Sequence, residues 1–211
     1  MYYYNGKINQ AFEIAKLDSA VAYNIFGECN EKYVGVLNNL AILYFYLKSD
    51  FSKARELLII SKECLENSKE NVDSLYSFTI SNLALVLENL GMFTQAEPLY
   101  LRSIEILKKL NIVDGYDYAQ NVHNLAQLYK RMGKYDESFK LFLESTELIK
   151  KIYGTNHDLY AIELNSLGDL YKFIGKYDKS EQYYKEALKL RKELLGEDNE
   201  KYASTLSNLA L

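Results

Sequence analysis

The residues that could perform acid–base or metal chemistry are few and stand apart. His123 and His157 are the only histidines of the 211-residue chain. Neither has a cysteine or a carboxylate three or four residues away, the helical spacing that creates zinc sites. We therefore expect no metal-binding site, and His157, in a polar connector, is expected to be exposed.

Three Gly-Lys pairs resemble part of a phosphate-binding loop: Gly6-Lys7, Gly133-Lys134 and Gly175-Lys176. A P-loop also needs a glycine at a fixed distance upstream and a serine or threonine directly after the lysine. Both are absent, so we interpret the pairs as turn residues.

Paired carboxylates also occur, as at Glu193 and Glu197, four residues apart. Acidic residues at this spacing are ordinary on the solvated face of a helix and do not by themselves make an acid–base pair. With no nucleophile, base and orienting group in one pattern, the sequence predicts a protein that is not an enzyme and needs no cofactor.

Composition and charge narrow the class of protein. The net charge of −4 argues against nucleic acid or an anionic membrane as the main partner. No run of 18 uncharged apolar residues exists, and the first seven residues lack the apolar core of a signal peptide. Cys29 and Cys64 show no CxxC spacing, so we expect free thiols, a reducing compartment and a cytoplasmic location.

The chain is an array of one repeated unit. An Asn-Leu-Ala triplet, degenerate once, recurs in steps of 43, 42, 42 and 42 residues. The five copies are Asn39-Leu40-Ala41, Asn82-Leu83-Ala84, Asn124-Leu125-Ala126, Ser166-Leu167-Gly168 and Asn208-Leu209-Ala210. A repeat of this length is one supersecondary unit that stacks on its neighbours, which predicts a solenoid.

Each unit is expected to hold two helices, A and B, joined by a glycine turn. In the third unit one apolar helical stripe ends at Met132-Gly133-Lys134, and a second runs from Tyr135 to Gly154. A small residue of each B helix precedes the next triplet by 28 residues throughout. The only insertion is one residue, near Ser49-Asp50, where the step from Asn39 to Ala54 is 15 residues instead of 14.

These positions resemble the tetratricopeptide repeat. The likeness rests on Leu125-Ala126, Tyr129, the glycine turn, Ser138, Phe142 and Ser145, with their counterparts in the other units. The 42-residue length is similar to the variety found in kinesin light chains. The resemblance implies an all-α fold, an α-α superhelix of antiparallel helix pairs, in a single solenoid over residues 1–211. Its units are a partial unit 1–28, units of about 29–70, 71–112, 113–155 and 156–197, and a partial unit 198–211.

By this resemblance the A helices line a concave groove that binds a peptide. One column of groove positions lies two residues before each leucine and another lies one before it. The predicted peptide-binding residues are Asn38, Asn39, Asn82, His123, Asn124, Gln127, Lys130, Arg131, Asn165, Lys172, Phe45, Phe78 and Leu85. Asparagine can pair with the main chain of an extended peptide. The alternative is that these amides tie adjacent A helices to each other.

The groove changes character along the chain. Its first part is apolar, whereas Lys130, Arg131 and Lys172 give the later part a basic edge. A partner with apolar anchors and acidic residues would suit it; alternatively, these cations simply favour helix C-termini. The lysine–asparagine pairing of a carboxylate clamp is missing, since Asn38/Ile42 and Asn165/Asp169 stand at the matching positions, which disfavours a C-terminal chaperone tail as ligand.

We therefore interpret the chain as a non-enzymatic module that recognises a segment of a partner protein on its concave face. The alternative is a structural or self-associating scaffold within a larger multidomain protein that carries an effector domain. Repeat arrays need a polar terminal unit at each end, and we recognise none at either end of this sequence. Either the chain is a segment of a longer protein, or its ends stack on other copies. The molecular mass in solution distinguishes these two functions: it should stay that of a monomer for a peptide-binding module and rise with protein concentration for an assembling scaffold.

Overall fold

The computed structural model describes residues 2–68 and 73–210, with side chains for residues 10–68 and 73–209. Within these residues the chain holds ten α-helices, one π-helical segment and no strand, so the predicted all-α class is confirmed. The helices form two compact units, Met1–Asn111 and Ile112–Leu211, each described by itself below. The expected boundary between residues 70 and 71 lies outside the described residues.

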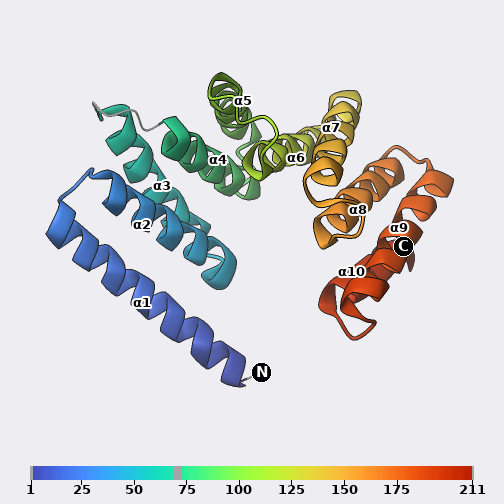
Figure 1. Cartoon of the computed structure of the whole chain (residues 1–211), viewed down its shortest axis with the longest axis horizontal. Coiled ribbons are helices and arrows are strands. Elements are labelled where there is room, and N and C mark those ends of the chain that lie inside the picture. Colours follow the sequence, from blue (N-terminus) through green and yellow to red (C-terminus); the bar gives the residue numbers. More distant parts are fainter. Residues whose placement is uncertain (1, 69–72, 211) are drawn as a thin grey trace. The chain divides into compact units, whose positions relative to one another are not determined.

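Unit 1 contains three B helices and two A helices that pack on one another in chain order (Figure 1). Its elements are α1 (Tyr2–Phe26), α2 (Glu31–Leu43), η1 (Tyr44–Lys48), α3 (Phe51–Glu66), α4 (Asp73–Asn89) and α5 (Phe93–Lys109). The A helices are α2 and α4. The hydrophobic core between α2 and α3 includes Val34, Cys64 and Leu65, all nearly inaccessible to solvent.

Unit 2 contains three A helices and two B helices, also packed in chain order (Figure 1). They are α6 (Tyr116–Arg131), α7 (Tyr135–Tyr153), α8 (Asp158–Phe173), α9 (Tyr177–Leu195) and α10 (Glu200–Ala210). The A helices are α6, α8 and α10. One core cluster joins Ala126, Phe142, Leu167 and Leu170, so the triplet residues lie at the helix–helix interfaces, as the repeat predicts.

Glycine closes the A helices at three of the four turns between an A helix and its B helix. Gly91, Gly133 and Gly175 have φ of +75°, +77° and +72°, a conformation that costs glycine little. The residue after each glycine donates its N–H to the carbonyl five residues back, as in Lys134 to Tyr129 at 2.9 Å. This is the Schellman arrangement, and it confirms the predicted turns at Gly133-Lys134 and Gly175-Lys176.

The one-residue insertion is absorbed as a π-helical turn. Residues Tyr44–Lys48 form η1, and the Asp50 N–H bonds to the Tyr44 carbonyl, six residues back, at 3.1 Å. Ser49 takes the left-handed position with φ 50°, where the other turns have glycine. The extra residue therefore lengthens the last helical turn and leaves the register of the flanking helices intact.

The prediction of a turn at Gly6-Lys7 is wrong, because α1 runs without interruption from Tyr2 to Phe26. A glycine inside a helix costs about 1 kcal/mol relative to alanine, and the helix keeps the backbone hydrogen bonds that a turn would break. The glycine-turn pattern is therefore not sufficient by itself to end a helix.

Small residues allow the A and B helices of one unit to approach closely. The Ser138 hydroxyl donates to the Ala126 carbonyl and the Ser180 hydroxyl to the Gly168 carbonyl, both at 2.8 Å. At Gly168 a methyl group would lie 2.8 Å from two ring carbons of Tyr184. Short side chains at these positions are thus a steric requirement of the packing.

Candidate functional site

Two predicted binding residues of the first groove column, Asn38 and His123, are buried inside their units, whereas Asn165 is half-buried. In unit 1, Asn38 of α2 is completely buried, and its Nδ2 donates to Thr79 Oγ1 of α4 at 2.7 Å. A ligand cannot reach this amide without separating the two helices. The expectation that Asn38 contacts a peptide is therefore corrected: as in the alternative interpretation, it ties adjacent A helices.

His123 makes the same connection in unit 2. Its Nδ1 lies 2.8 Å from Glu163 Oε1 of α8, and Glu163 Oε2 accepts a hydrogen bond from the Ser145 hydroxyl of α7 at 2.6 Å. His123 is 8% exposed as a residue, and its imidazole packs edge-on against Phe142, with ring centroids 5.4 Å apart. His123 is thus an interior residue as well, and the prediction that it contacts a ligand is not supported.

The role of Glu163, which contacts both His123 and Ser145, was not predicted from the sequence. Thr79 and Glu163 each stand three residues before the first residue of their own triplet. Each contacts the residue that immediately precedes the triplet of the previous A helix, Asn38 or His123. The sequence does contain a signal for this contact. Glu163 is an acidic residue at a helix position that is otherwise buried, and a histidine, His123, stands at the partner position one repeat earlier.

The asparagines of the second column are more accessible than Asn38 and His123, although Ser166 in that column is buried. In unit 1, Asn39 is exposed on α2, and Asn82 on α4 is half-buried. The Nδ2 atom of Asn82 is itself buried and has no hydrogen-bond partner among the described residues. In unit 2, Asn124 Oδ1 accepts from Gln120 Nε2 at 2.9 Å, and Asn208 of this column donates from Nδ2 to Oδ1 of Asn165, a first-column residue, at 3.3 Å. These half-buried amides keep part of their hydrogen-bonding capacity.

The predicted apolar anchors of unit 1 differ in accessibility. Phe45 is only 9% exposed and packs against Tyr46 and Phe51, with ring centroids 4.8 and 5.2 Å away. Phe78 is 43% exposed on α4, and Leu85 on the same helix is half-buried. Phe45 therefore belongs to the interior, whereas Phe78 and Leu85 remain available.

The predicted basic residues of unit 2 are not equivalent. Lys130 Nζ lies 3.6 Å from Asp169 Oδ2 and 5.5 Å from the centre of the Phe173 ring, and its side chain is only 10% exposed. Its charge is thus compensated within unit 2. Arg131 is exposed. Gln127 Nε2 donates to Ser166 Oγ of α8 at 3.1 Å.

Lys172 lines a pocket of about 280 Å³ in unit 2 and makes no ion pair among the described residues. The other lining residues come from α9 and α10: Tyr177, Asp178, Ser180, Glu181, Tyr184, Asn208 and Leu209. The Tyr184 hydroxyl donates to Asp169 Oδ1 at 2.5 Å. Burial, followed by this hydrogen bond, raises the pKa of the Tyr184 hydroxyl.

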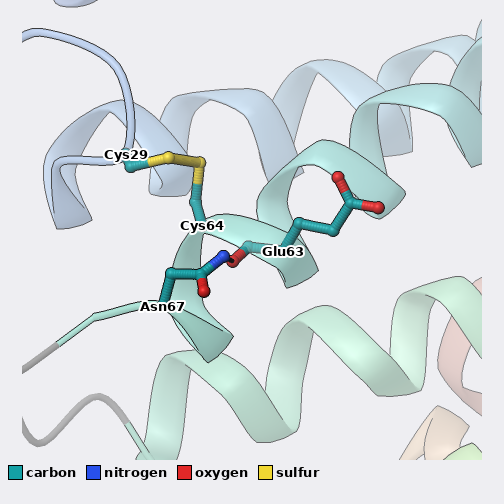
Figure 2. The surroundings of a disulfide bond; sticks show 4 residues. All are labelled: Cys29, Glu63, Cys64 and Asn67. Atoms are coloured by element: carbon teal, nitrogen blue, oxygen red, sulfur yellow. Dashed lines mark hydrogen bonds between the residues drawn. A yellow bond between two sulfur atoms is a disulfide. The ribbon is translucent and has the colours of Figure 1, made fainter.

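The expectation of two free thiols is wrong. Cys29 and Cys64 form a disulfide, with Cα atoms 4.7 Å apart, that links the α1–α2 connector to α3 (Figure 2). The residues are 35 positions apart in sequence, and only the packing of α3 on α2 brings them together. This finding removes one basis of the predicted reducing compartment.

Over residues 2–68 and 73–210, no group of three or more histidine, cysteine, aspartate or glutamate side chains is placed to hold a metal ion. In the same part of the chain, no helix has both the length and the apolar character needed to cross a membrane.

Solved structures show the same fold. BtubC (BKLC) from P. vanneervenii has a TM-score of 0.75 at 21% identity, over 97% of this chain and 80% of that one. A Podosopora anserina putative kinesin light chain with nearly identical TPR-like repeats has 0.71 at 16%, over 92% and 91%. The apo form of RapI has 0.72 at 14%, over 99% and 78%.

A curated relative is more similar in sequence over a shorter stretch. The mitochondrial tetratricopeptide repeat protein 19 homolog of Drosophila melanogaster is 34% identical over 93 residues, which are 44% of this chain and 24% of the relative. The match therefore spans about a quarter of that relative. The sequence patterns of the tetratricopeptide repeat family match residues 79–112, 117–193 and 164–211, together more than half of the chain. The chain belongs to the tetratricopeptide repeat family.

Proposed function

We propose that this protein is a non-enzymatic module that binds an extended segment of a partner protein along the accessible faces of its A helices. Its family fold suggests a scaffold for protein–protein interaction. The finer proposal concerns which residues contact the partner. Asn38, His123 and Phe45 are excluded by burial, and Lys130 by its pairing with Asp169.

One stripe of α4 supports this proposal most directly. Phe78, Asn82 and Leu85 are spaced four and then three residues apart, so they lie on one face of the helix. An exposed aromatic ring, an amide with an unpaired Nδ2 and a half-buried leucine thus stand in one line. A peptide main chain would satisfy the amide, once its side chain turns outward, and apolar side chains of the peptide would cover the ring.

In unit 2 the same register carries polar groups. Asn124, Gln127 and Arg131 follow one another at spacings of three and four residues on α6. Asn165 and Lys172 lie on α8, and Lys172 provides a cation beside the pocket. We propose that this part contacts polar and acidic residues of a partner, whereas the stripe of α4 contacts apolar ones.

A peptide-display selection against the whole chain tests the proposal. The variant Phe78→Ala/Asn82→Ala removes the centre of the stripe. The control variant, Leu101→Ala, truncates a side chain of α5 that is similarly exposed, 46% against 43%. We expect an enriched motif that survives in the control and is lost in the double variant. Enrichment of no motif, or of one that persists in both variants, would contradict the proposal.

Self-association is the second candidate, and exposed apolar residues on α1 and α10 favour it. Ile14, Leu17, Val21 and Ile25 form one stripe of α1, each more than half exposed. On α10, Leu206 is 46% exposed, although Leu164, its repeat equivalent on α8, is 2% exposed. Because α1 is a B helix and α10 an A helix, contact between them from two copies would repeat the packing of an A helix on the B helix that follows it, as in α6 with α7 and α8 with α9.

Light scattering at several protein concentrations tests this candidate. We expect the mass to rise with concentration, and the variants Val21→Glu and Leu206→Glu to abolish the rise because each buries a charge in the contact. A concentration-independent monomer mass would exclude self-association of these faces.

We also propose a cytoplasmic location, in which cellular thiols would keep Cys29 and Cys64 reduced. Rapid alkylation in cells that naturally contain the protein, followed by mass measurement, tests this. Alkylation of both cysteines agrees with the proposal, and a pair that resists alkylation until it is reduced contradicts it.

A further inference from the structure

We propose that Cys29 and Cys64 form a reversible thiol-modification site, which exchanges with low-molecular-weight thiols and disulfides and controls how firmly α1 is attached to unit 1. This inference is independent of the proposed peptide binding. It rests on the different environments of the two sulfur atoms, on the position of the bond in the fold and on the thin interface of α1.

The two cysteines differ in accessibility. Cys29 is exposed in the connector between α1 and α2, whereas Cys64 is 4% exposed in the third-last position of α3. Cys64 packs in the apolar cluster of Val34 and Leu65. The Glu63 carboxylate points away from the bond, and the Asn67 side chain donates to the Glu63 carbonyl (Figure 2). An external thiol therefore reaches the sulfur of Cys29 and not that of Cys64.

This asymmetry gives each sulfur a role in thiol–disulfide exchange. An external thiolate attacks Cys29 Sγ, the bond between the cysteines breaks, and the electron pair leaves on Cys64, which takes up a proton in its apolar surroundings. A second external thiolate then attacks the external sulfur of the mixed disulfide and releases Cys29 as a thiolate. The external thiols are oxidised to their disulfide, and oxidation of the pair is the reverse reaction.

The bond is a covalent link between the α1–α2 connector and α3. Cys29 has φ 66°, in the left-handed region that non-glycine residues rarely adopt. The corresponding connector of unit 2 is held by an ion pair instead, with Lys151 Nζ of α7 at 2.6 Å from Asp114 Oδ1. Cys29 and Asp114 each lie ten residues before the first residue of a triplet. Of these two links, only the disulfide of Cys29 and Cys64 can be opened by a thiol.

Opening the bond would act on α1, because α1 packs mainly on α2. Among the described side chains of α1, only Phe12 and Ala22 are buried. Two edge-on ring pairs add to the interface, Phe12 with Tyr44 and Tyr23 with Tyr33. A helix with so few buried residues opens more readily than the rest of its unit, and a cross-link between its connector and α3 limits that opening.

Hydrogen exchange of the whole chain, equilibrated in glutathione or in glutathione disulfide, tests the proposal. We expect the amides of residues 10–26 to exchange about tenfold faster or more in the reduced protein, while those of unit 2 are unchanged. The variant Cys29→Ser/Cys64→Ser controls for the buffers and should resemble the reduced protein in both. Equal exchange of α1 in the two buffers, or failure of the disulfide to form in glutathione disulfide, would overturn the proposal.

Single variants test the roles of the two sulfurs without relying on stability. In glutathione disulfide, the variant Cys64→Ser should gain one glutathione at Cys29, because that thiol is exposed. The variant Cys29→Ser should react at Cys64 at least about tenfold more slowly, because burial protects it. Equal rates of modification would refute the assignment of Cys29 as the reacting sulfur.

Discussion

His123 and Glu163 meet inside unit 2, with Nδ1 and Oε1 2.8 Å apart, and connect two A helices through side chains 40 residues apart in sequence. Asn38 and Thr79 make the corresponding connection in unit 1 through neutral groups. Each unit thus contains one such polar contact between two A helices, at equivalent repeat positions but with different chemistry. A binding surface can use only the residues that this contact leaves accessible.

Removing the carboxylate should destabilise unit 2. The variant Glu163→Ala leaves His123 and Ser145 buried without their partner, at a cost of about 3 kcal/mol in the free energy of unfolding. Urea denaturation followed by circular dichroism measures it. The control Glu193→Ala, on an exposed residue of α9, should change the free energy by less than about 0.5 kcal/mol. Equal effects of the two variants would show that the buried contact contributes nothing.

A methyl group at Gly168 should destabilise the packing of α8 on α9. The added Cβ would lie 2.8 Å from the Tyr184 ring, and the resulting strain of about 1–3 kcal/mol exceeds the gain in helix propensity. Thermal unfolding measures the loss. The second change Tyr184→Leu should recover part of it, since Ala41 and Leu58 occupy these positions in unit 1.

The matched control is Gly35→Ala, on α2, where an added Cβ meets nothing within 4 Å. Only helix propensity acts there, so we expect a stabilisation of about 0.5–1 kcal/mol. A loss of stability at both glycines would indicate that the clash with Tyr184 is not the cause at Gly168.

Glycine at position 49 should stabilise unit 1. Ser49 has φ 50°, a conformation that costs a residue with a Cβ about 1 kcal/mol more than glycine. The variant Ser49→Gly should therefore raise the unfolding free energy by about that amount in a denaturant titration. In contrast, Ser52→Gly, in the first turn of α3, should lower it by a few tenths to about 1 kcal/mol. A lower unfolding free energy in the Ser49→Gly variant as well would contradict this prediction.

Unit 1 should lose stability in alkaline solution through Tyr76. Burial, together with the hydrogen bond to Glu66, raises the pKa of Tyr76 from 10.0 to about 12. Because the folded-state pKa is the higher one, this contribution is complete below pH 10 and is lost as the pH rises through about 12. The variant Tyr76→Phe should flatten the fall in stability between these values, measured by denaturation at several pH values. Tyr177→Phe, at an exposed tyrosine, should leave the fall unchanged.

The sequence alone determined the repeat, the helix pairs and the glycine turns, because these depend on local backbone preferences and on periodic apolar residues. The Asn-Leu-Ala triplets predicted the interfaces of Ala126 and Leu167, and Gly133 predicted its turn. Gly6 shows the limit of this reasoning, since the same pattern lies inside α1. A turn also depends on what the following segment packs against, and that is a tertiary property.

Only the tertiary structure decided which polar residues remain accessible. Asn38 and Asn39 are consecutive residues and both were predicted to face the groove, yet one amide is buried against α4 and the other is exposed. The rotation of each helix about its axis, which the packing of its neighbours fixes, makes that difference. The same holds for Cys29 and Cys64: their spacing resembles no motif, and they meet because α2 and α3 pack side by side.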